Sequence, residues 1–185
     1  MDLKGKTAII TAGGSGIGRV TVERFIELGA SVCLCDVVDE ALEETARAFP
    51  EAIVVKADVS RSGDVAALYD AFLAKHSRLD ILVNNAGIRS YEPLDEAKAE
   101  TWQKILSVNL LSYAYLAREA LPALRQAGKG AIVNISSTHA FNPRGGMGQY
   151  DVAKAGIISM TKTLAFEEAD RGVRVRLLLD DNGIP

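Results

Sequence analysis

The sequence of 185 residues has no excess of basic side chains, because 21 Lys and Arg stand against 24 Asp and Glu, a formal net charge of −3 at pH 7. A nucleic acid or an anionic membrane surface would require a basic stripe, so we expect neither as a partner. No apolar run approaches the ~20 residues of a membrane span, and residues 1–6 lack the apolar stretch of a signal peptide. These absences predict a soluble, cytoplasmic protein.

Cysteine and histidine are scarce, with two of each. Cys33 and Cys35 are two residues apart in an apolar run, so on a strand they would point to the same face and a disulfide between them would be strained. We interpret them as small core residues of a protein in a reducing compartment. No group of His, Cys, Asp and Glu has metal-ligand spacing, so we expect no metal site.

What the sequence does contain is a regular alternation of short apolar runs with helix-length segments. The runs are rich in Val and Ile and cover residues 7–11, 32–35, 53–57, 81–84, 131–136 and 173–178. Such runs are typical of strands buried on both faces, and their alternation with helices implies right-handed crossovers and a parallel sheet. The prediction is one doubly wound α/β domain over residues 1–185. Gly29 is expected to end one helix, and Ser60 with Asp64 to begin another.

The first run leads into a glycine-rich turn, Thr11-Ala12-Gly13-Gly14-Ser15-Gly16-Ile17-Gly18. Glycines at a strand-to-helix turn let the backbone approach a pyrophosphate, which the helix N-terminus attracts. Asp36 lies 18 residues after Gly18, near the ~20-residue spacing at which an acid accepts the ribose 2′-hydroxyl of NAD. A carboxylate there would repel a 2′-phosphate, and neither Ser15 nor Val37 is a cation, so NAD is favoured over NADP. Alternatively, the glycines form only a tight turn and Asp36 only ends a strand.

Further motifs follow in a fixed order: Asp58-Val59, Asn84-Asn85-Ala86-Gly87, Asn109, Ser137, and Tyr150 with Lys154. Together with the turn they resemble the short-chain dehydrogenases/reductases, which are NAD(P)-dependent oxidoreductases with a Rossmann fold, over roughly residues 3 to 176. The resemblance implies that the catalytic residues are Asn109, Ser137, Tyr150 and Lys154. It implies that the cofactor is bound by Thr11, Gly13, Ser15, Gly16, Ile17, Gly18, Asp36, Asp58, Val59, Asn85, Ala86, Gly87, Tyr150 and Lys154. One departure is Ala12, where the family usually has its first glycine, and we expect Gly13 to relieve the backbone there.

Tyr150 and Lys154 are four residues apart, so on a helix they share one face. A phenol with the ordinary pKa of about 10 is a poor base at neutral pH, but a nearby ammonium and a positive nicotinamide favour the phenolate. Tyr150 would then take the proton of an alcohol as hydride leaves for NAD, and return it in the reverse direction. By resemblance, Ser137 holds the substrate oxygen, Lys154 also binds the nicotinamide ribose, and Asn109 holds a water that relays protons. Alternatively, the Tyr–Lys pair is a surface contact and Ser137 a helix cap.

The expected substrate is a small secondary alcohol or its ketone. Arg89, His139 and Arg144 lie near the motifs and would favour a polar or anionic substrate such as a sugar acid or hydroxy acid; alternatively, they are solvated loop residues.

The C-terminal part departs from the family pattern after Arg176, which stands where the family usually has Asn. Family members follow the sixth strand with a Pro-Gly pair, a lid and a seventh strand, which are not found here. The resemblance therefore predicts a C-terminally incomplete domain without the last strand and lid, with an exposed apolar edge at residues 173–179. The helices expected at 109–126 and 150–169 resemble those that pair such enzymes into dimers or tetramers, and a further helix is expected at 96–107. Two hypotheses remain: an NAD-dependent oxidoreductase that forms a homo-oligomer if complete, or a catalytically impaired nucleotide-binding fragment that associates with full-length partners.

Overall fold

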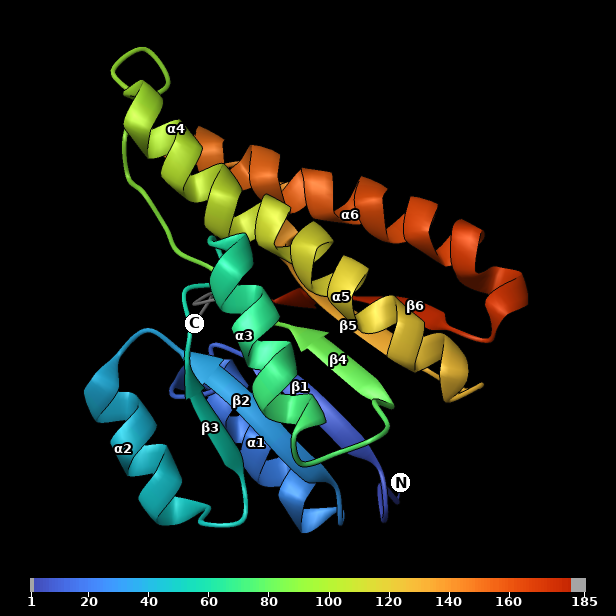
Figure 1. Ribbon diagram of the computed structural model, residues 1–185. Helices are drawn as coiled ribbons and strands as arrows, with labels where there is room; N and C mark the ends of the chain where they lie inside the picture. Colours follow the sequence, from blue (N-terminus) through green and yellow to red (C-terminus); the bar gives the residue numbers. More distant parts are fainter. Residues whose placement is uncertain (1, 181–185) are drawn as a thin grey trace.

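The computed structural model describes residues 2–180 and contains a six-stranded sheet. Its strands are β1 (Thr7–Thr11), β2 (Ser31–Asp36), β3 (Ile53–Lys56), β4 (Ile81–Asn84), β5 (Ala131–Ser137) and β6 (Arg174–Asp180). They run in the order β3-β2-β1-β4-β5-β6 with every neighbouring pair parallel. Every apolar run forms a strand, so the doubly wound parallel α/β fold is confirmed (Figure 1).

The helices lie on both faces of this sheet (Figure 1). They are α1 (Gly16–Glu27), α2 (Asp39–Ala48), α3 (Ser62–Leu73), α4 (Ala99–Leu106), α5 (Ser112–Gln126) and α6 (Gly148–Glu168), with short helical turns η1 (Ser107–Leu111), η2 (Thr138–Ala140) and η3 (Ala169–Arg171). Helices α1 and α2 pack on one face of the sheet and α3, α5 and α6 on the other, so both faces are covered, as the apolar strands predict. No helix within residues 2–180 is long and apolar enough to cross a membrane.

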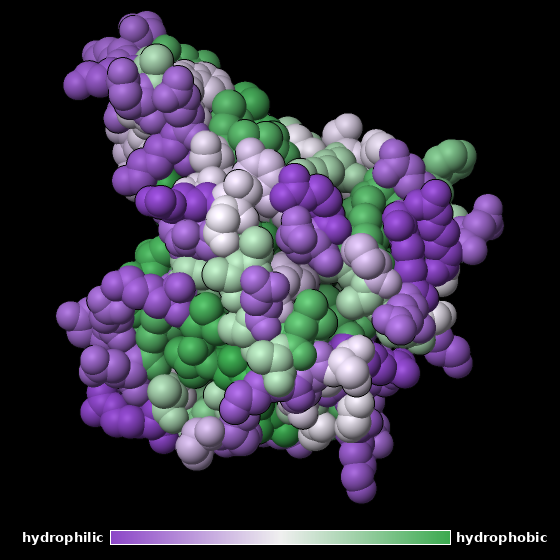
Figure 2. Space-filling model, in the orientation of Figure 1, coloured by the Kyte–Doolittle hydropathy of each residue, from purple (hydrophilic) through white to green (hydrophobic). Residues whose placement is uncertain are grey.

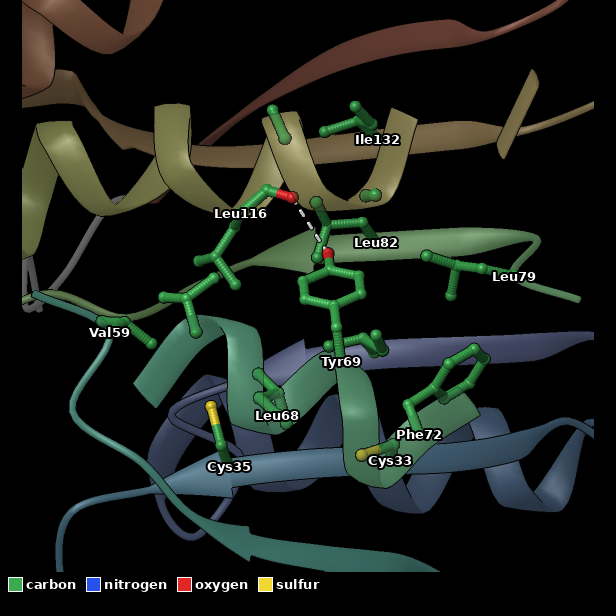
Figure 3. Packing of buried hydrophobic residues seen from close by; sticks show 14 of the residues in the cluster. Cys33, Cys35, Val59, Leu68, Tyr69, Phe72, Leu79, Leu82, Leu116 and Ile132 are labelled. Atoms are coloured by element: carbon green, nitrogen blue, oxygen red, sulfur yellow. Dashed lines mark hydrogen bonds between the residues drawn. The ribbon is translucent and has the colours of Figure 1, made fainter. Parts of the chain in front are cut away.

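The larger core cluster lies between the sheet and helices α3 and α5 (Figure 3). Tyr69 of α3 donates its hydroxyl proton to the Leu116 carbonyl of α5 at 3.0 Å, which links the two helices inside the core. Cys33 and Cys35 are buried here as free thiols, and burial raises the pKa of each to about 12. Both lie at 0% exposure in the core cluster, so their interpretation as small core residues is confirmed.

Two helix boundaries test the capping predictions. Gly29 has φ +88° and follows Leu28, the C-cap residue of α1, so the predicted stop is confirmed. The predicted start at Ser60 is wrong, because α3 begins at Ser62. The Ser60 backbone N–H and hydroxyl both donate to Asp58 Oδ1, at 2.9 and 2.7 Å, and form a turn in place of a helix cap. Asp64 instead accepts the backbone N–H of Asp58 at 3.0 Å.

Helices α4 and α5 continue into one another through η1, which is a π-helical turn. The sequence predicts two helices, at 96–107 and 109–126, whereas the first begins only at Ala99 and the turn carries Asn109 between them. A π-turn holds an extra residue, so it changes the direction in which the following side chains point. Such turns often mark functional sites, and this one places Asn109 in the interior.

Strand β6 is the edge of the sheet within residues 2–180 and pairs with β5 from Arg174 to Asp180. Its side chains include Leu178, which is 51% exposed. The predicted exposed apolar edge is thus found in the part of the chain that the structure describes. That residues 1–185 form one domain without the last strand and lid stays a prediction, and residues 181–185 lie outside the described part.

Candidate active site

The glycine-rich turn joins β1 to α1 at the carboxyl edge of the sheet. A Cβ atom on Gly18 would lie 1.9 Å from the Ala12 carbonyl oxygen, and one on Gly13 would lie 2.7 Å from Leu34 Cβ. Only glycine fits at either position. Ser15 precedes α1 but makes no capping hydrogen bond, and Ser15, Gly16 and Ile17 are exposed. The first N–H groups of α1 therefore face solvent without a side-chain partner, as a pyrophosphate-binding turn requires.

Ala12 carries the strain of this turn. Its φ is +50°, and within residues 2–180 it is the only non-glycine residue with a positive φ. The expectation that Gly13 relieves the backbone is wrong, since Gly13 is not among the residues with positive φ. The left-handed conformation brings Cβ close to the following carbonyl oxygen, and alanine, unlike glycine, bears that cost.

Hydrogen bonds from the two residues that follow β4 hold the turn in place. The Thr11 hydroxyl oxygen accepts the backbone N–H groups of Asn85 and Ala86, each at 3.0 Å. Asn85 Nδ2 donates to the Thr11 carbonyl at 3.0 Å and to the Ala12 carbonyl at 3.3 Å. The Thr11 side chain is fully buried, so it positions the backbone and does not face the groove.

Asp36 is the last residue of β2 and is only 9% exposed. Its Oδ2 accepts the Gly14 N–H at 3.1 Å, and its Oδ1 accepts the Val37 N–H at 2.7 Å. These bonds fix the carboxylate beside the glycine-rich turn. The sequence did not single out Gly14 as the partner of Asp36. The 18-residue spacing between Gly18 and Asp36 does not reveal which N–H of the turn the carboxylate accepts.

Two adjoining cavities lie along the carboxyl edge of the sheet, where the strand order reverses between β1 and β4, the usual ligand position in such folds. The first cavity, of about 460 Å³, lies between the ends of β2 and β3 and helix α4 and is lined by Asp36, Asp58 and Val59. Figure 2 shows the hollow between α2 and α4 in which it lies. The second cavity, of about 520 Å³, is lined by Tyr150 and Lys154. Both are lined by Ala12, Ser15 and Gly87, so together they form one groove.

Most of the predicted site residues line this groove. Those that line it are Ser15, Ile17, Asp36, Asp58, Val59, Asn85, Ala86, Gly87, Tyr150 and Lys154. The predicted site residues that do not line it are Thr11, Gly13, Gly16, Gly18, Asn109 and Ser137. A cavity of about 540 Å³ beside β6 and the end of α6 contains none of them. No group of His, Cys, Asp and Glu within residues 2–180 is arranged to hold a metal ion.

Tyr150 and Lys154 lie together near the start of α6, where the Lys154 Nζ is 5.5 Å from the centre of the Tyr150 ring. The Nζ donates to the Ile135 carbonyl at 2.9 Å. Burial lowers the pKa of Lys154 to about 8, with Asp180 opposing the shift and Arg89 adding to it. The ammonium is thus held in a low-dielectric position where its charge acts strongly on its surroundings.

The two serines at the end of β5 have different partners. Ser136 donates its hydroxyl proton to the Lys154 carbonyl at 2.7 Å, so it ties β5 to α6. The Ser137 hydroxyl oxygen accepts the His139 backbone N–H at 3.2 Å. Within residues 2–180 its own proton has no acceptor, which distinguishes Ser137 from Ser136, whose proton goes to Lys154.

Asn109 holds the loop that follows β4. Its Nδ2 donates to the Ile88 carbonyl and its Oδ1 accepts the Ile88 N–H, both at 2.8 Å. A Cβ on Gly87 would lie 3.6 Å from Lys154 Nζ and 3.7 Å from Asn109 Oδ1. Asn109, Gly87 and Lys154 are therefore neighbours, although the sequence separates them widely.

Arg89, His139 and Arg144, which the sequence places near the motifs, lie in different environments. The Arg89 guanidinium carbon lies 5.9 Å from the centre of the Tyr150 ring, and Arg89 lines the second cavity. Buried His139 places Nδ1 2.9 Å from Asp151 Oδ1, and its ring meets that of Tyr150 edge-on. Arg144 is exposed. Of these three side chains, Arg89 is the one that lines the groove.

Sequence reasoning missed Asp151, Asp180 and Lys104. Asp151 is the partner of His139, Asp180 lines the second cavity, and Lys104 lines the first. Asp180 ends β6, and the rule that ligands bind at strand carboxyl ends would have pointed to it. No local pattern marks Lys104, which reaches the groove because α4 passes beside it.

Comparison with known proteins agrees with this geometry. The family model for the short chain dehydrogenases matches residues 6–179. A 3beta-hydroxysteroid dehydrogenase 1 of Eggerthella lenta is 40% identical over 183 residues, covering 96% of this chain and 70% of the relative. Glucose 1-dehydrogenase 2 of Bacillus subtilis is 38% identical over 184 residues, covering 96% and 71%. The crystal structure of a 3-ketoacyl-(acyl-carrier-protein) reductase from Brucella melitensis, complexed with NADH, superposes with a TM-score of 0.95 at 34% identity, covering 99% of this chain and 78% of that one.

Proposed function

The chain belongs to the short chain dehydrogenase family, an oxidoreductase family acting on CH–OH groups, and we propose that it interconverts a small secondary alcohol and its ketone with NAD as hydride acceptor. The observation that carries the proposal is one continuous groove with the anchored Asp36 carboxylate at one end and the Tyr150–Lys154 pair at the other. The names of the relatives include a steroid and a sugar dehydrogenase, so the substrate is not inherited from the family.

The residues of the groove fit a dinucleotide. The exposed start of α1 and the glycine-only positions 13 and 18 would hold the pyrophosphate, and Asp36 would accept a ribose hydroxyl. Asp58 and Val59 would lie beside the adenine in the first cavity. The fixed carboxylate of Asp36 would repel a 2′-phosphate, which favours NAD over NADP. Tyr150 and Lys154 would bind the nicotinamide ribose in the second cavity.

When bound, NAD would accept the hydride. The protein's own residues would accept and donate the proton of the alcohol hydroxyl. As the carbinol C–H bond breaks with its electron pair and the C=O bond forms, Tyr150 takes the hydroxyl proton and passes it toward solvent. The Lys154 ammonium favours the phenolate that this step needs. Ser137, whose hydroxyl oxygen is already bound by the His139 N–H, would donate its own proton to the substrate oxygen. In the reverse direction Tyr150 returns the proton to the carbonyl oxygen.

Asn109 acts as a positioning residue in this proposal. Both ends of its carboxamide bind Ile88, so the side chain fixes the loop that carries Gly87 against Lys154. A proton-relaying water, which the resemblance implies, would be held more readily by the main chain of the π-turn than by this occupied side chain.

The first test is titration of the chain with NADH, followed by energy transfer from Trp102 and the tyrosines to the cofactor. We expect saturable binding that weakens in Asp36→Ala but not in Asp70→Ala, an exposed acid on α3. Oxidation of a panel of secondary alcohols is then followed at the NADH absorbance, with Tyr150→Phe as the inactive control. Binding without turnover would support the alternative of an impaired nucleotide-binding fragment, and absence of binding would refute the proposal.

A further inference from the structure

Arg89 is a cation of the second cavity that the proposed hydride transfer does not use. It directly follows Ile88, whose N–H and carbonyl are both bound by Asn109, so its backbone is held rigidly. Its guanidinium carbon is 5.9 Å from the centre of the Tyr150 ring. Arg89 is therefore placed beside the group that exchanges the proton with the substrate.

Among residues 2–180, three charged side chains line the cavity: Arg89, Lys154 and Asp180. Lys154 is buried, donates to the Ile135 carbonyl and acts on Tyr150. Asp180 lies near enough to Lys154 to raise its pKa against the effect of burial. No ion pair within residues 2–180 includes Arg89; hydrogen bonds to Tyr91 and Tyr150 raise the pKa of Arg89 against the opposing effect of burial. Arg89 is thus an exposed guanidinium at the cavity wall, and its neighbours there are the side chains of Tyr91 and Tyr150.

A guanidinium in this position matches one chemical group well. Its planar array of donors binds a carboxylate through two parallel hydrogen bonds, which a neutral hydroxyl cannot accept in the same way. Because the guanidinium carbon is 5.9 Å from the centre of the Tyr150 ring, Arg89 suits a substrate whose carboxylate is close to the carbinol carbon, either adjacent to it or one carbon away. A second carboxylate would meet Asp180, so a monoacid fits better than a diacid.

We propose that Arg89 binds the carboxylate of the substrate and that the enzyme oxidises a short 2- or 3-hydroxy acid to the corresponding keto acid. This inference rests on the proposed function. The step is balanced: the carbinol C–H electron pair goes to NAD as hydride, the O–H proton goes to Tyr150, and the carboxylate keeps its charge.

The test compares each acid with its neutral amide, which has nearly the same shape. Lactate is measured against lactamide, and 3-hydroxybutyrate against 3-hydroxybutanamide, all with NAD. We expect at least one acid to be preferred over its amide. In Arg89→Ala the KM of that acid should rise about 10- to 100-fold, the range for losing a hydrogen-bonded charge, while the KM of the amide changes little. Arg144→Ala, in the exposed loop nearby, is the matched control and should leave both unchanged.

A competing role for Arg89 would be to stabilise the Tyr150 phenolate. In that case Arg89→Ala would lower kcat for acids and amides alike and displace the pH profile of kcat for both, with no change in their KM ratio. This result, or equal use of acids and amides by the wild-type chain, would overturn the proposal.

A binding measurement separates this inference from the proposed function. With NADH present, 2-methylpropanoate should form a ternary complex that changes NADH fluorescence, whereas 2-methylpropanamide should not, and Arg89→Ala should abolish the difference. Turnover of neutral alcohols without binding or turnover of any carboxylate would overturn the inference and leave the proposed function standing. Failure to bind NADH at all would overturn both.

Discussion

Replacing Ala12 by glycine should stabilise this protein, against the usual expectation for an Ala→Gly substitution. Ala12 has φ +50° in the glycine-rich turn. The conformation is imposed from outside, because Asn85 binds the Ala12 carbonyl and Gly18 packs closely against it. The residue cannot relax to negative φ without breaking these contacts.

The size of the effect follows from two opposing terms. A left-handed conformation costs a non-glycine residue roughly 1–2 kcal/mol. Glycine loses more conformational entropy on folding, which costs about 0.4–1 kcal/mol relative to alanine. The net gain in the free energy of unfolding is then about 0.5–1 kcal/mol, or a rise in Tm of about 1–4 °C for a chain of this length.

Thermal and urea unfolding of the wild-type chain and Ala12→Gly measure this difference. Ala67→Gly is the control, because Ala67 is exposed in α3 and the same chemical change there should cost about 1 kcal/mol. Ala12→Val tests the opposite direction, since a β-branched residue tolerates positive φ least.

Destabilisation of Ala12→Gly by as much as Ala67→Gly would refute the reasoning. It would mean that the turn accommodates the alanine methyl without strain, and that the glycine expected at this position by resemblance has no energetic basis in this chain.

Three further outcomes follow from the same contacts. Gly18→Ala would place a methyl group 1.9 Å from a carbonyl oxygen of the turn, so we expect a loss of about 3 kcal/mol in urea unfolding and no detectable NADH binding. Although burial raises it, hydrogen bonds from Arg78 and Lys6 hold the pKa of Asp80 below its usual range, so the stability that Asp80 contributes is present above about pH 4 and is lost as the pH falls. Asp80→Asn should cost roughly 2 kcal/mol at pH 7 and progressively less in acid. Burial lowers the pKa of Lys154 to about 8 in the folded chain, below that of an unfolded lysine. The free energy of unfolding of the wild-type chain should therefore rise by about 3 kcal/mol relative to that of Lys154→Met between pH 8 and 10.5. The same pH dependence in both proteins would contradict the lowered pKa of Lys154.

The sheet could be predicted from the sequence because burial on both faces leaves a direct signal. The six runs consist mostly of apolar residues, with Val and Ile prominent, and each of them became a strand. Asp36 could be placed at the first cavity for a related reason: a residue that ends a parallel strand lies at the carboxyl edge, whatever its other neighbours are.

The π-turn could not be predicted, because its cause lies outside the helix. The amphipathic pattern of residues 99–126 fits an ordinary helix on either side of Asn109. The extra residue is accompanied by the two hydrogen bonds between Asn109 and Ile88, a partner 21 residues away. The same holds for His139, whose partner Asp151 is 12 residues away and belongs to another element.

Ala12 shows a different limit. The sequence shows that Ala12 stands where the family usually has glycine. It also suggests, wrongly, that the neighbouring Gly13 adopts the left-handed conformation in its place. Glycine is needed at position 13 for close packing, since a Cβ there would collide with Leu34 of β2. Two adjacent glycine-favouring positions thus arise from two separate constraints, φ at one and packing at the other, which a linear motif does not distinguish.

The polar residues of the motifs divide into those that fix the backbone and those that remain available for chemistry. Asn85 binds the turn after β1, Asn109 binds the loop after β4, and Ser136 binds α6. The side chain of each donates a hydrogen bond to a main-chain carbonyl of another segment. The ends of the strands and α6 are therefore held at fixed separations. Tyr150 and Arg89 owe their place in the groove to these bonds. Loss of one of the three ties should therefore reduce turnover without removing any group that contacts the substrate.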